Sequence, residues 1–196
     1  MPVDRASRLP VTLTRRGVLF GAPVGLAALL LPTDAEAVSA RTLTTEAKQA
    51  LAALYGTNPK TRELSRRAKA TLVFPKIVKA GLMIGGQTGD GALLKQGRAE
   101  AFYNLSAASF GLQLGAQRFS YALFLMNDDA LAYLDKSDGW SIGSGPSVVV
   151  ADKGMARSLT STTLTHDVYA FPFGQKGIMA GIGLEGSKIT RITPDR

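Results

Sequence analysis

The densest cluster of chemically active side chains in this sequence is a run of cations. Seven lysines and arginines fall within 20 residues, against the single carboxylate of Glu63. They are Lys60, Arg62, Arg66, Arg67, Lys69, Lys76 and Lys79. Because each cation near an anionic leaflet is worth about 1 kcal/mol, four or five of them would hold the protein on phospholipid by roughly 4–5 kcal/mol. The alternative is a solvated helix face whose apolar stripe, Leu64, Ala68 and Leu72, packs on the core.

Nucleic acid is the rival partner for such a basic segment. Single-strand-binding proteins interleave aromatic residues with their cations, whereas Phe74 is the one aromatic residue in this stretch. The sequence therefore favours anionic phospholipid over nucleic acid. Leu72, Val73 and Phe74 are candidates either for insertion into a membrane or for the core.

Side chains suited to catalysis are sparse. His166 is the only histidine, and Ser161 and Asp167 lie too near it along one expected strand to converge on it without help from the fold. No nucleophile-elbow motif is present. Asp128 and Asp129 indicate helix capping rather than a paired acid and base. We therefore predict that the protein is not an enzyme.

The sequence also predicts neither a metal nor a cofactor. The chain has no cysteine, which excludes disulfides and cysteine-based zinc sites. Residues 85–91 are rich in glycine, but Asp90 supplies one carboxylate where a calcium loop supplies several. No Lys-Ser or Lys-Thr pair follows them, so they are not a phosphate-binding P-loop. We expect a turn at residues 85–91.

The local pattern predicts two helices before the sheet. Leu43, Ala47, Leu51 and Leu54 recur at helical spacing, with Thr44 as the expected N-cap and Gly56 as the stop. A second helix is expected from Asn58-Pro59 up to Pro75, and it would carry most of the cations.

After Ile77 the pattern becomes that of β-strands. We expect strands at 77–84, 92–94, 99–105, 109–116, 119–126, 147–151, 158–165, 167–171, 177–184 and 187–192, and a short helix capped by Asn127 and ending at Leu134. The nearly apolar stretch 119–126 is expected to be central. Helices followed by strands predict an α+β fold, with a glycine-rich, mainly antiparallel curled sheet or barrel-like β core after the N-terminal helices.

Three short stretches share glycines four residues apart with apolar residues between them: 81–85, 111–115 and 177–181. In an extended strand the two glycines of each stretch would lie on one face. We therefore expect something to pack very close to that face, or the sheet to bend sharply there.

The N-terminal residues 1–37 have the pattern of an export signal. Arg15-Arg16 precedes an apolar run from Gly17 to Leu31, and Ala35-Glu36-Ala37 offers a cleavage site. The paired arginines are similar to a twin-arginine signal; an uncleaved anchor is the alternative. We expect residues 38–196, with a net charge of +7, to form one domain of an exported bacterial protein that is periplasmic or secreted and associates peripherally with a membrane.

Three blocks in order resemble the SYLF domain, also called the Ysc84-type domain. They are residues 71–86, 101–117 and 173–187, within a resemblance that runs from about Leu43 to Ile192. The resemblance implies a lipid-binding module. Eukaryotic relatives recognise phosphoinositides through a basic N-terminal part, and some fungal members bind actin filaments.

Together these observations predict non-enzymatic binding of anionic phospholipid membranes through the basic N-terminal helical region. In a bacterial envelope the abundant anionic lipids are phosphatidylglycerol and cardiolipin. The alternative is an envelope structural or interaction module that binds another protein and no lipid.

Overall fold

Two helices lead into an eight-stranded sheet in the computed structural model. The structure describes residues 39–82, 84–110, 115–136, 139–151, 164–177, 184 and 186–195, all within one compact unit, Glu36–Arg196. The predicted export signal lies outside them. The helices are α1 (Ala40–Thr57), α2 (Lys60–Arg67) and α3 (Asp128–Leu134), and the strands are β1 (Ala70–Leu82), β2 (Ile84–Lys95), β3 (Arg98–Phe110), β4 (Gly115–Leu125), β5 (Trp140–Ser141), β6 (Val148–Val150), β7 (Val168–Gly177) and β8 (Lys188–Ile192).

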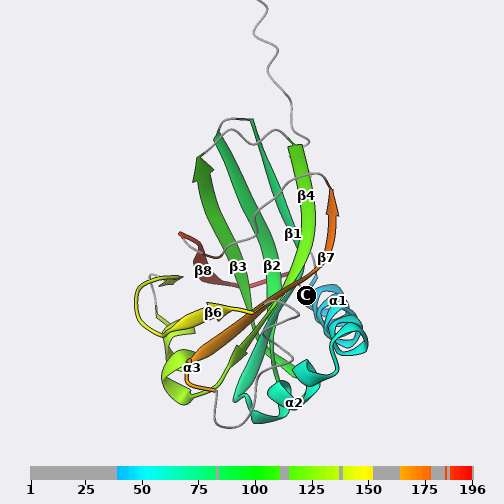
Figure 1. Ribbon diagram of the computed structural model, residues 1–196, viewed down its shortest axis with the longest axis vertical. Helices are drawn as coiled ribbons and strands as arrows, with labels where there is room; N and C mark the ends of the chain where they lie inside the picture. Colours follow the sequence, from blue (N-terminus) through cyan, green and yellow to red (C-terminus); the bar gives the residue numbers. More distant parts are fainter. Residues whose placement is uncertain are drawn as a thin grey trace, which may run out of the picture. The chain divides into compact units, whose positions relative to one another are not determined.

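The strands form a single curled sheet in the order β5-β8-β3-β2-β1-β4-β7-β6 (Figure 1). All pairs are antiparallel except β6 and β7, which run parallel. The fold is therefore α+β with a mainly antiparallel curled sheet, as predicted. Strand β4 lies between β1 and β7, which confirms the central position expected for residues 119–126.

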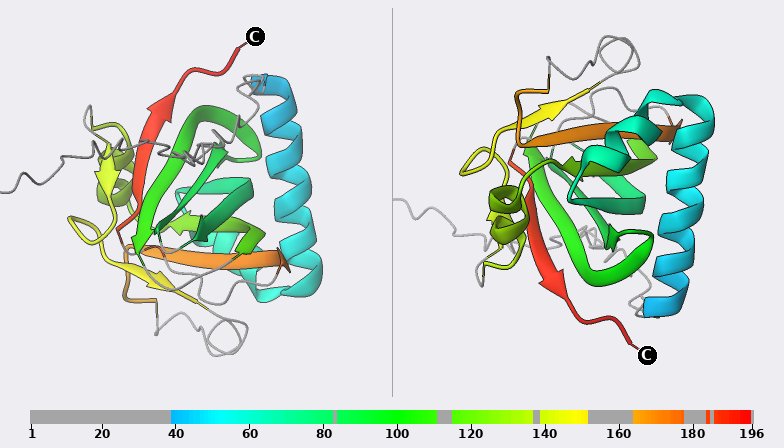
Figure 2. Two further views of the ribbon diagram at one scale, coloured as in Figure 1. Left: turned by 90° about the horizontal axis from the view of Figure 1, so that it is seen from above. Right: turned by 90° about the horizontal axis from the view of Figure 1, so that it is seen from below.

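Alternating side chains on the central strands build two cores, one on each face of the sheet. Val73 and Phe124 pack with Leu51 and Leu64 of α1 and α2. Their chain neighbours, such as Leu72 and Leu123, pack on the opposite face with Ala130 and Leu134 of α3. Two buried faces explain why β4 is nearly all apolar. Helices α1 and α2 consequently lie on one side of the sheet and α3 on the other (Figures 1 and 2).

Helix α1 begins earlier and ends later than expected. Ser39 is its N-cap, and its hydroxyl accepts a hydrogen bond from the amide of Thr42 at 3.3 Å; Thr44 is one turn inside the helix. Gly56 lies in the last turn rather than ending it. The predicted buried face is confirmed. Among the described residues, no helix has the length and apolar character needed to cross a bilayer.

The second helix is much shorter than expected, and the prediction that it runs to Pro75 is wrong. It ends at Arg67, and Ala68 already has extended backbone angles. The amide of Lys69 then donates to the carbonyl of Leu125 at 2.8 Å, which starts the pairing of β1 with β4. Burial on both faces of the sheet outweighs the local helical spacing of Leu64, Ala68 and Leu72.

The predicted turn at residues 85–91 is also wrong, because these residues form the first half of β2. A side chain at Gly91 would place its Cβ 2.5 Å from the Phe74 ring and 2.7 Å from the Val73 carbonyl oxygen. A Cβ at Gly89 would lie 2.5 Å from the carbonyl oxygen of Lys76. Because these glycines have no side chain, the irregular part of β1 can approach β2 closely. The register between the two strands shifts there, between Val73 and Val78.

The glycine stretch 81–85 spans the connection between β1 and β2 instead of lying within one strand. Gly81 and Gly85 face each other across the β1–β2 connection, and Gly81 also pairs with Gly115 of β4. Glycines from two different stretches thus form one cross-strand row. Residues 111–114 and 178–181 of the other stretches lie outside the described residues.

Most of the elements expected after residue 98 are present in the structure. The short helix is confirmed as α3, and the Asn127 side chain caps it by accepting from the amide of Ala130 at 2.8 Å. Strands expected at 99–105, 147–151, 167–171 and 187–192 correspond to β3, β6, β7 and β8. The strand expected at 109–116 is wrong in its bounds, since Phe110 ends β3 and Gly115 begins β4. Residues 158–163 and 178–183 of the other two expected strands fall outside the described part.

Candidate functional site

A hollow of about 900 Å³ opens beside the helices, on the side of the sheet that they cover. Its walls come from α1, from α2 and the start of β1, and from the hairpin that joins β2 to β3. Six cations line it: Lys48, Arg62, Arg66, Arg67, Lys69 and Lys95. None of the described lining residues carries a carboxylate. We call this feature the basic hollow.

The apolar part of the basic hollow comes from short or buried side chains. Leu51 and Leu94 belong to the core under the helices, and Ala52 and Ala68 line the hollow beside them. The hollow therefore combines positive charge with hydrocarbon surface. Such a lining suits a ligand that is itself part anionic and part apolar.

Helix α1 supplies its wall through helical spacing. Lys48, Ala52 and Tyr55 are four and three residues apart, so they lie on one flank of the helix. The Arg62 guanidinium lies over the Tyr55 ring, 5.4 Å from its centroid. Burial raises the pKa of the Tyr55 hydroxyl, against the opposing effects of a hydrogen bond with Ser65 and the charge of Arg62. The two helices are thus joined at the hollow by an aromatic–cation contact.

The β2–β3 hairpin supplies the opposite wall through a two-residue turn. Gln96 and Gly97 both have positive φ, at 50° and 77°, and the flanking Lys95 and Arg98 are paired. Two successive residues of positive φ match the twist of a tight hairpin. This turn holds Lys95 at the hollow, where its ammonium lies 3.9 Å from the carboxylate of Glu100.

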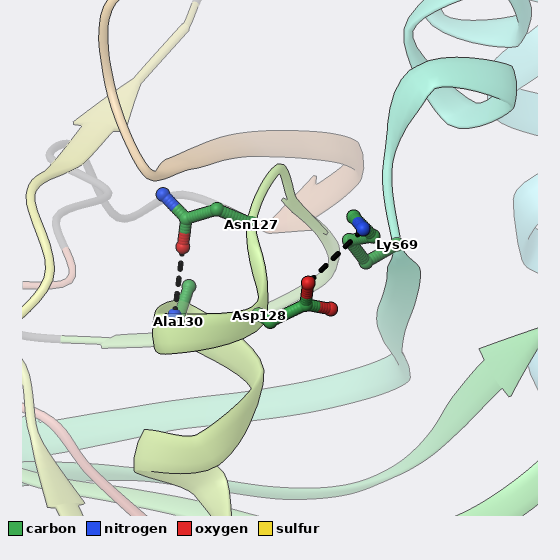
Figure 3. A network of polar contacts seen from close by, with 4 residues as sticks. All are labelled: Lys69, Asn127, Asp128 and Ala130. Atoms are coloured by element: carbon green, nitrogen blue, oxygen red, sulfur yellow. Dashed lines mark hydrogen bonds and ion pairs between the residues drawn. The ribbon is translucent and has the colours of Figure 1, made fainter.

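Lys69 connects the basic hollow to the start of α3. Its ammonium donates to the carboxylate of Asp128 at 3.0 Å, beside the Asn127 cap (Figure 3). The two side chains are 50% and 77% exposed, so water screens the pair and it adds little to stability. The carboxylate does offset the charge that Lys69 contributes to the hollow.

The seven cations predicted as the lipid-binding site do not form one surface. Arg62, Arg66, Arg67 and Lys69 line the basic hollow. Lys60 is exposed at the first position of α2, outside the lining. Lys76 and Lys79 belong to β1; Lys76 is exposed, whereas Lys79 is 8% exposed.

Lys79 lies on the sheet face away from α1 and α2. It is two residues from Ile77, which packs in the core of that face, and strand alternation puts both side chains on the same side. Its cross-strand neighbours are Gln87 and Gln117, which are also buried. Lys79 therefore belongs to a buried polar row rather than to the basic hollow.

Sequence reasoning missed Lys48 and Lys95. Helical spacing places Lys48 on the same side of α1 as Tyr55. Only the tertiary structure shows that α2 packs beside this side and makes Lys48 part of the hollow. A second, shallower hollow of about 590 Å³ shares Lys48 and adds Arg41 and Arg98. The positive surface therefore extends along α1 and the hairpin.

The acidic and histidine residues weighed for catalysis take structural roles or lie apart. Asp128 and Asp129 occupy the first turn of α3. His166 is exposed, and its ring stacks edge-on against Tyr169. Asp90 accepts a hydrogen bond from Asn104 at 2.7 Å. Among the described residues, no three His, Asp or Glu side chains are grouped to hold a metal ion.

A protein-family model matches the second half of the chain. Residues 106–193 match the family model described as Ysc84, Las17-binding protein actin regulator. The matched segment begins in β3 and extends past β8, so it covers part of β3 and strands β4 to β8 but not β1 and β2. The lining of the basic hollow, residues 48–97, precedes it. No curated protein matches the chain.

Proposed function

Since residues 106–193 match the model of the Ysc84 (SYLF) family of lipid- and actin-binding domains, we propose that this protein binds membranes containing anionic phospholipids through the basic hollow. The observation that carries the proposal is the lining itself, in which six cations surround apolar side chains with no acidic neighbour among the described lining residues. The family match supports a lipid or protein partner in general. The charge and apolar lining of the hollow favour an anionic lipid.

The expected strength of this binding follows from the number of cations that face the leaflet. Lys69 and Lys95 have carboxylate partners, and we assign the main attraction to Lys48, Arg62 and Arg66. Three cations at about 1 kcal/mol each give roughly 3 kcal/mol, which is reversible adsorption rather than permanent anchoring. Salt weakens such binding, because the Debye length falls from about 10 Å at 0.1 M to about 3 Å at 1 M.

The proposed setting is the bacterial envelope. The predicted export signal at residues 1–37 would deliver a periplasmic or secreted protein, and phosphatidylglycerol or cardiolipin would be the anionic lipid that it meets. The protein would act by binding alone, as the absence of a recognisable catalytic motif in the sequence suggests.

Co-sedimentation with phosphatidylglycerol vesicles tests the proposal. We expect binding at low salt, loss of binding at high salt, and no binding to phosphatidylcholine vesicles. The double variant Lys48→Glu/Arg66→Glu should weaken binding by more than tenfold, because it reverses two charges at the hollow, each worth about 1 kcal/mol. Equal retention on neutral and anionic vesicles would contradict the proposal.

Two matched variants separate the basic hollow from general positive charge. Lys176→Glu/Lys188→Glu makes the same change in net charge at exposed strand residues outside the hollow, and we expect a much smaller loss. Lys60→Glu/Lys76→Glu reverses two cations of the linear sequence cluster that do not line the hollow. Equal losses in all three double variants would show that net charge alone drives adsorption.

A protein partner is the second candidate, because the family description names a Las17-binding protein and actin regulator. It predicts indifference to vesicles together with saturable binding to a protein. Pull-down and size-exclusion chromatography with and without liposomes distinguish the two candidates.

A further inference from the structure

The basic hollow is concave and three-sided, which separates it from a flat adsorbing surface. Its volume of about 900 Å³ falls in the range of about 300–1,000 Å³ that is typical of small-molecule sites. Cations reach it from α1, α2 and the hairpin, so a ligand inside it meets positive charge from three directions. A flat leaflet that only rests on the surface would meet this positive charge from one direction.

The lining also has a definite division of chemistry. Ala52, Ala68 and the Tyr55 ring present apolar surface, and Lys48, Arg62 and Arg66 present charge. Inorganic phosphate satisfies the charge and leaves the hydrocarbon exposed to water. An uncharged detergent covers the hydrocarbon but leaves the cations without an anion. A polynucleotide would find few partners for base stacking, because Tyr55 is the single aromatic residue of the described lining.

We propose that the basic hollow holds one molecule of an anionic lipid, with its phosphate among the cations and the first part of its hydrocarbon chain against Ala52 and Ala68. The inference rests on the proposed function and adds to it a saturable site for a single lipid. It also predicts that the protein binds lipid monomers in solution, where no leaflet exists.

The test uses the full chain and dihexanoyl phosphatidylglycerol, kept below its micelle-forming concentration. Titration calorimetry should give saturable binding with one lipid per protein. Inorganic phosphate and octyl glucoside, each titrated alone, should bind at least tenfold more weakly. Binding of inorganic phosphate as tight as that of the lipid would make the hollow a simple anion site and overturn the inference.

Neighbouring alanines on α1 provide a matched pair of variants. Ala52 lines the hollow and Ala53 does not, and both are exposed. Ala52→Trp should fill the hollow and weaken monomer binding at least tenfold, whereas Ala53→Trp should leave it unchanged. Thermal unfolding of both variants checks that each is folded; equal monomer binding by two folded variants would overturn the inference.

A charge variant gives a second, independent readout. Lys48→Gln should weaken monomer binding several-fold, and Lys188→Gln, outside the hollow, should not. Vesicle sedimentation of the same proteins distinguishes the proposed membrane binding from the proposed single-lipid site. Vesicle binding without monomer binding would overturn the single-lipid site and leave the proposed function intact, whereas failure of both would overturn both.

Discussion

Asp167 shows how one carboxylate can join three elements. Its side chain accepts hydrogen bonds from the amide and hydroxyl of Ser147, at 2.8 and 2.7 Å, and from the Asn127 amide at 2.6 Å. Asn127 in turn caps α3. These hydrogen bonds, led by those from Ser147, lower the pKa of Asp167 from its ordinary value of 3.8. The ionised carboxylate is therefore part of the junction between α3, β6 and β7.

The pH dependence of stability follows from the sign of that shift. Because the folded pKa is lowered, the stabilisation is present above the unfolded pKa near 3.8 and is lost as the pH falls through the folded value. Asp167→Asn should reduce the free energy of unfolding at pH 7 by about 1 kcal/mol, a low value for charged hydrogen bonds because the site is partly exposed. Urea unfolding should show this difference narrowing at about pH 3.

The control for this prediction is Asp195→Asn, which removes an exposed carboxylate elsewhere in the chain. It should change stability little at either pH. A difference between wild type and Asp167→Asn that stays constant with pH would show that ionisation of this group does not contribute.

Among the elements, β1 and β2 depend on each other through backbone space rather than side-chain packing. Strand β1 is irregular between Phe74 and Ile77, where its register with β4 shifts. Its neighbour β2 carries Gly89 and Gly91 at the point where β1 comes closest. The glycines thus permit β1 to bend while it remains paired on both sides.

Gly91→Ala should therefore destabilise the protein. Its Cβ would lie 2.7 Å from the Val73 carbonyl oxygen, and relief of such overpacking costs about 1–3 kcal/mol. Gly56→Ala is the matched comparison, because nothing lies within 4 Å of the added Cβ in α1 and alanine favours the helix by up to about 1 kcal/mol. Urea unfolding should show a lower free energy of unfolding for Gly91→Ala and a higher one for Gly56→Ala. Stabilisation by Gly91→Ala would contradict the close approach of β1 to Gly91.

At the scale of the whole unit from Glu36 to Arg196, the basic hollow and helix α3 lie on opposite sides of one sheet. The basic hollow lies with α1 and α2, and α3 packs on the other face. Lys69 precedes β1 between these two layers, where Asp128 of α3 reaches it. The acidic start of α3 therefore reduces the positive charge at the hollow from the far side of the sheet.

This arrangement predicts that Asp128→Asn strengthens binding to phosphatidylglycerol vesicles. Releasing one cation is worth about 1 kcal/mol, or roughly fivefold in affinity. Asp129→Asn makes the same charge change in the same turn of α3, without the contact to Lys69, and should have a smaller effect. Equal effects in co-sedimentation would mean that Lys69 does not take part in binding.

Local sequence determined the features that depend on near neighbours. The buried face of α1, the Asn127 cap of α3, the two-faced burial of β4 and the α+β class all follow from side-chain spacing and capping chemistry. The cation run from Lys60 to Lys69 also contains four of the six cations that line the hollow. Each of these features depends on residues that are close together in the chain, so the local sequence pattern is enough to predict it.

Only the tertiary structure decided where long-range pairing overrides local pattern. Pairing with β4 makes residues 70–74 a strand instead of a helix, and the approach of β1 makes residues 85–91 a strand instead of a turn. The same packing brings Lys48 and Lys95 to the basic hollow and leaves Lys76 and Lys79 out of it. Burial against residues distant in the chain outweighs local propensity, because propensity differences are below about 1 kcal/mol per residue whereas a buried apolar side chain contributes about 1.5–3 kcal/mol.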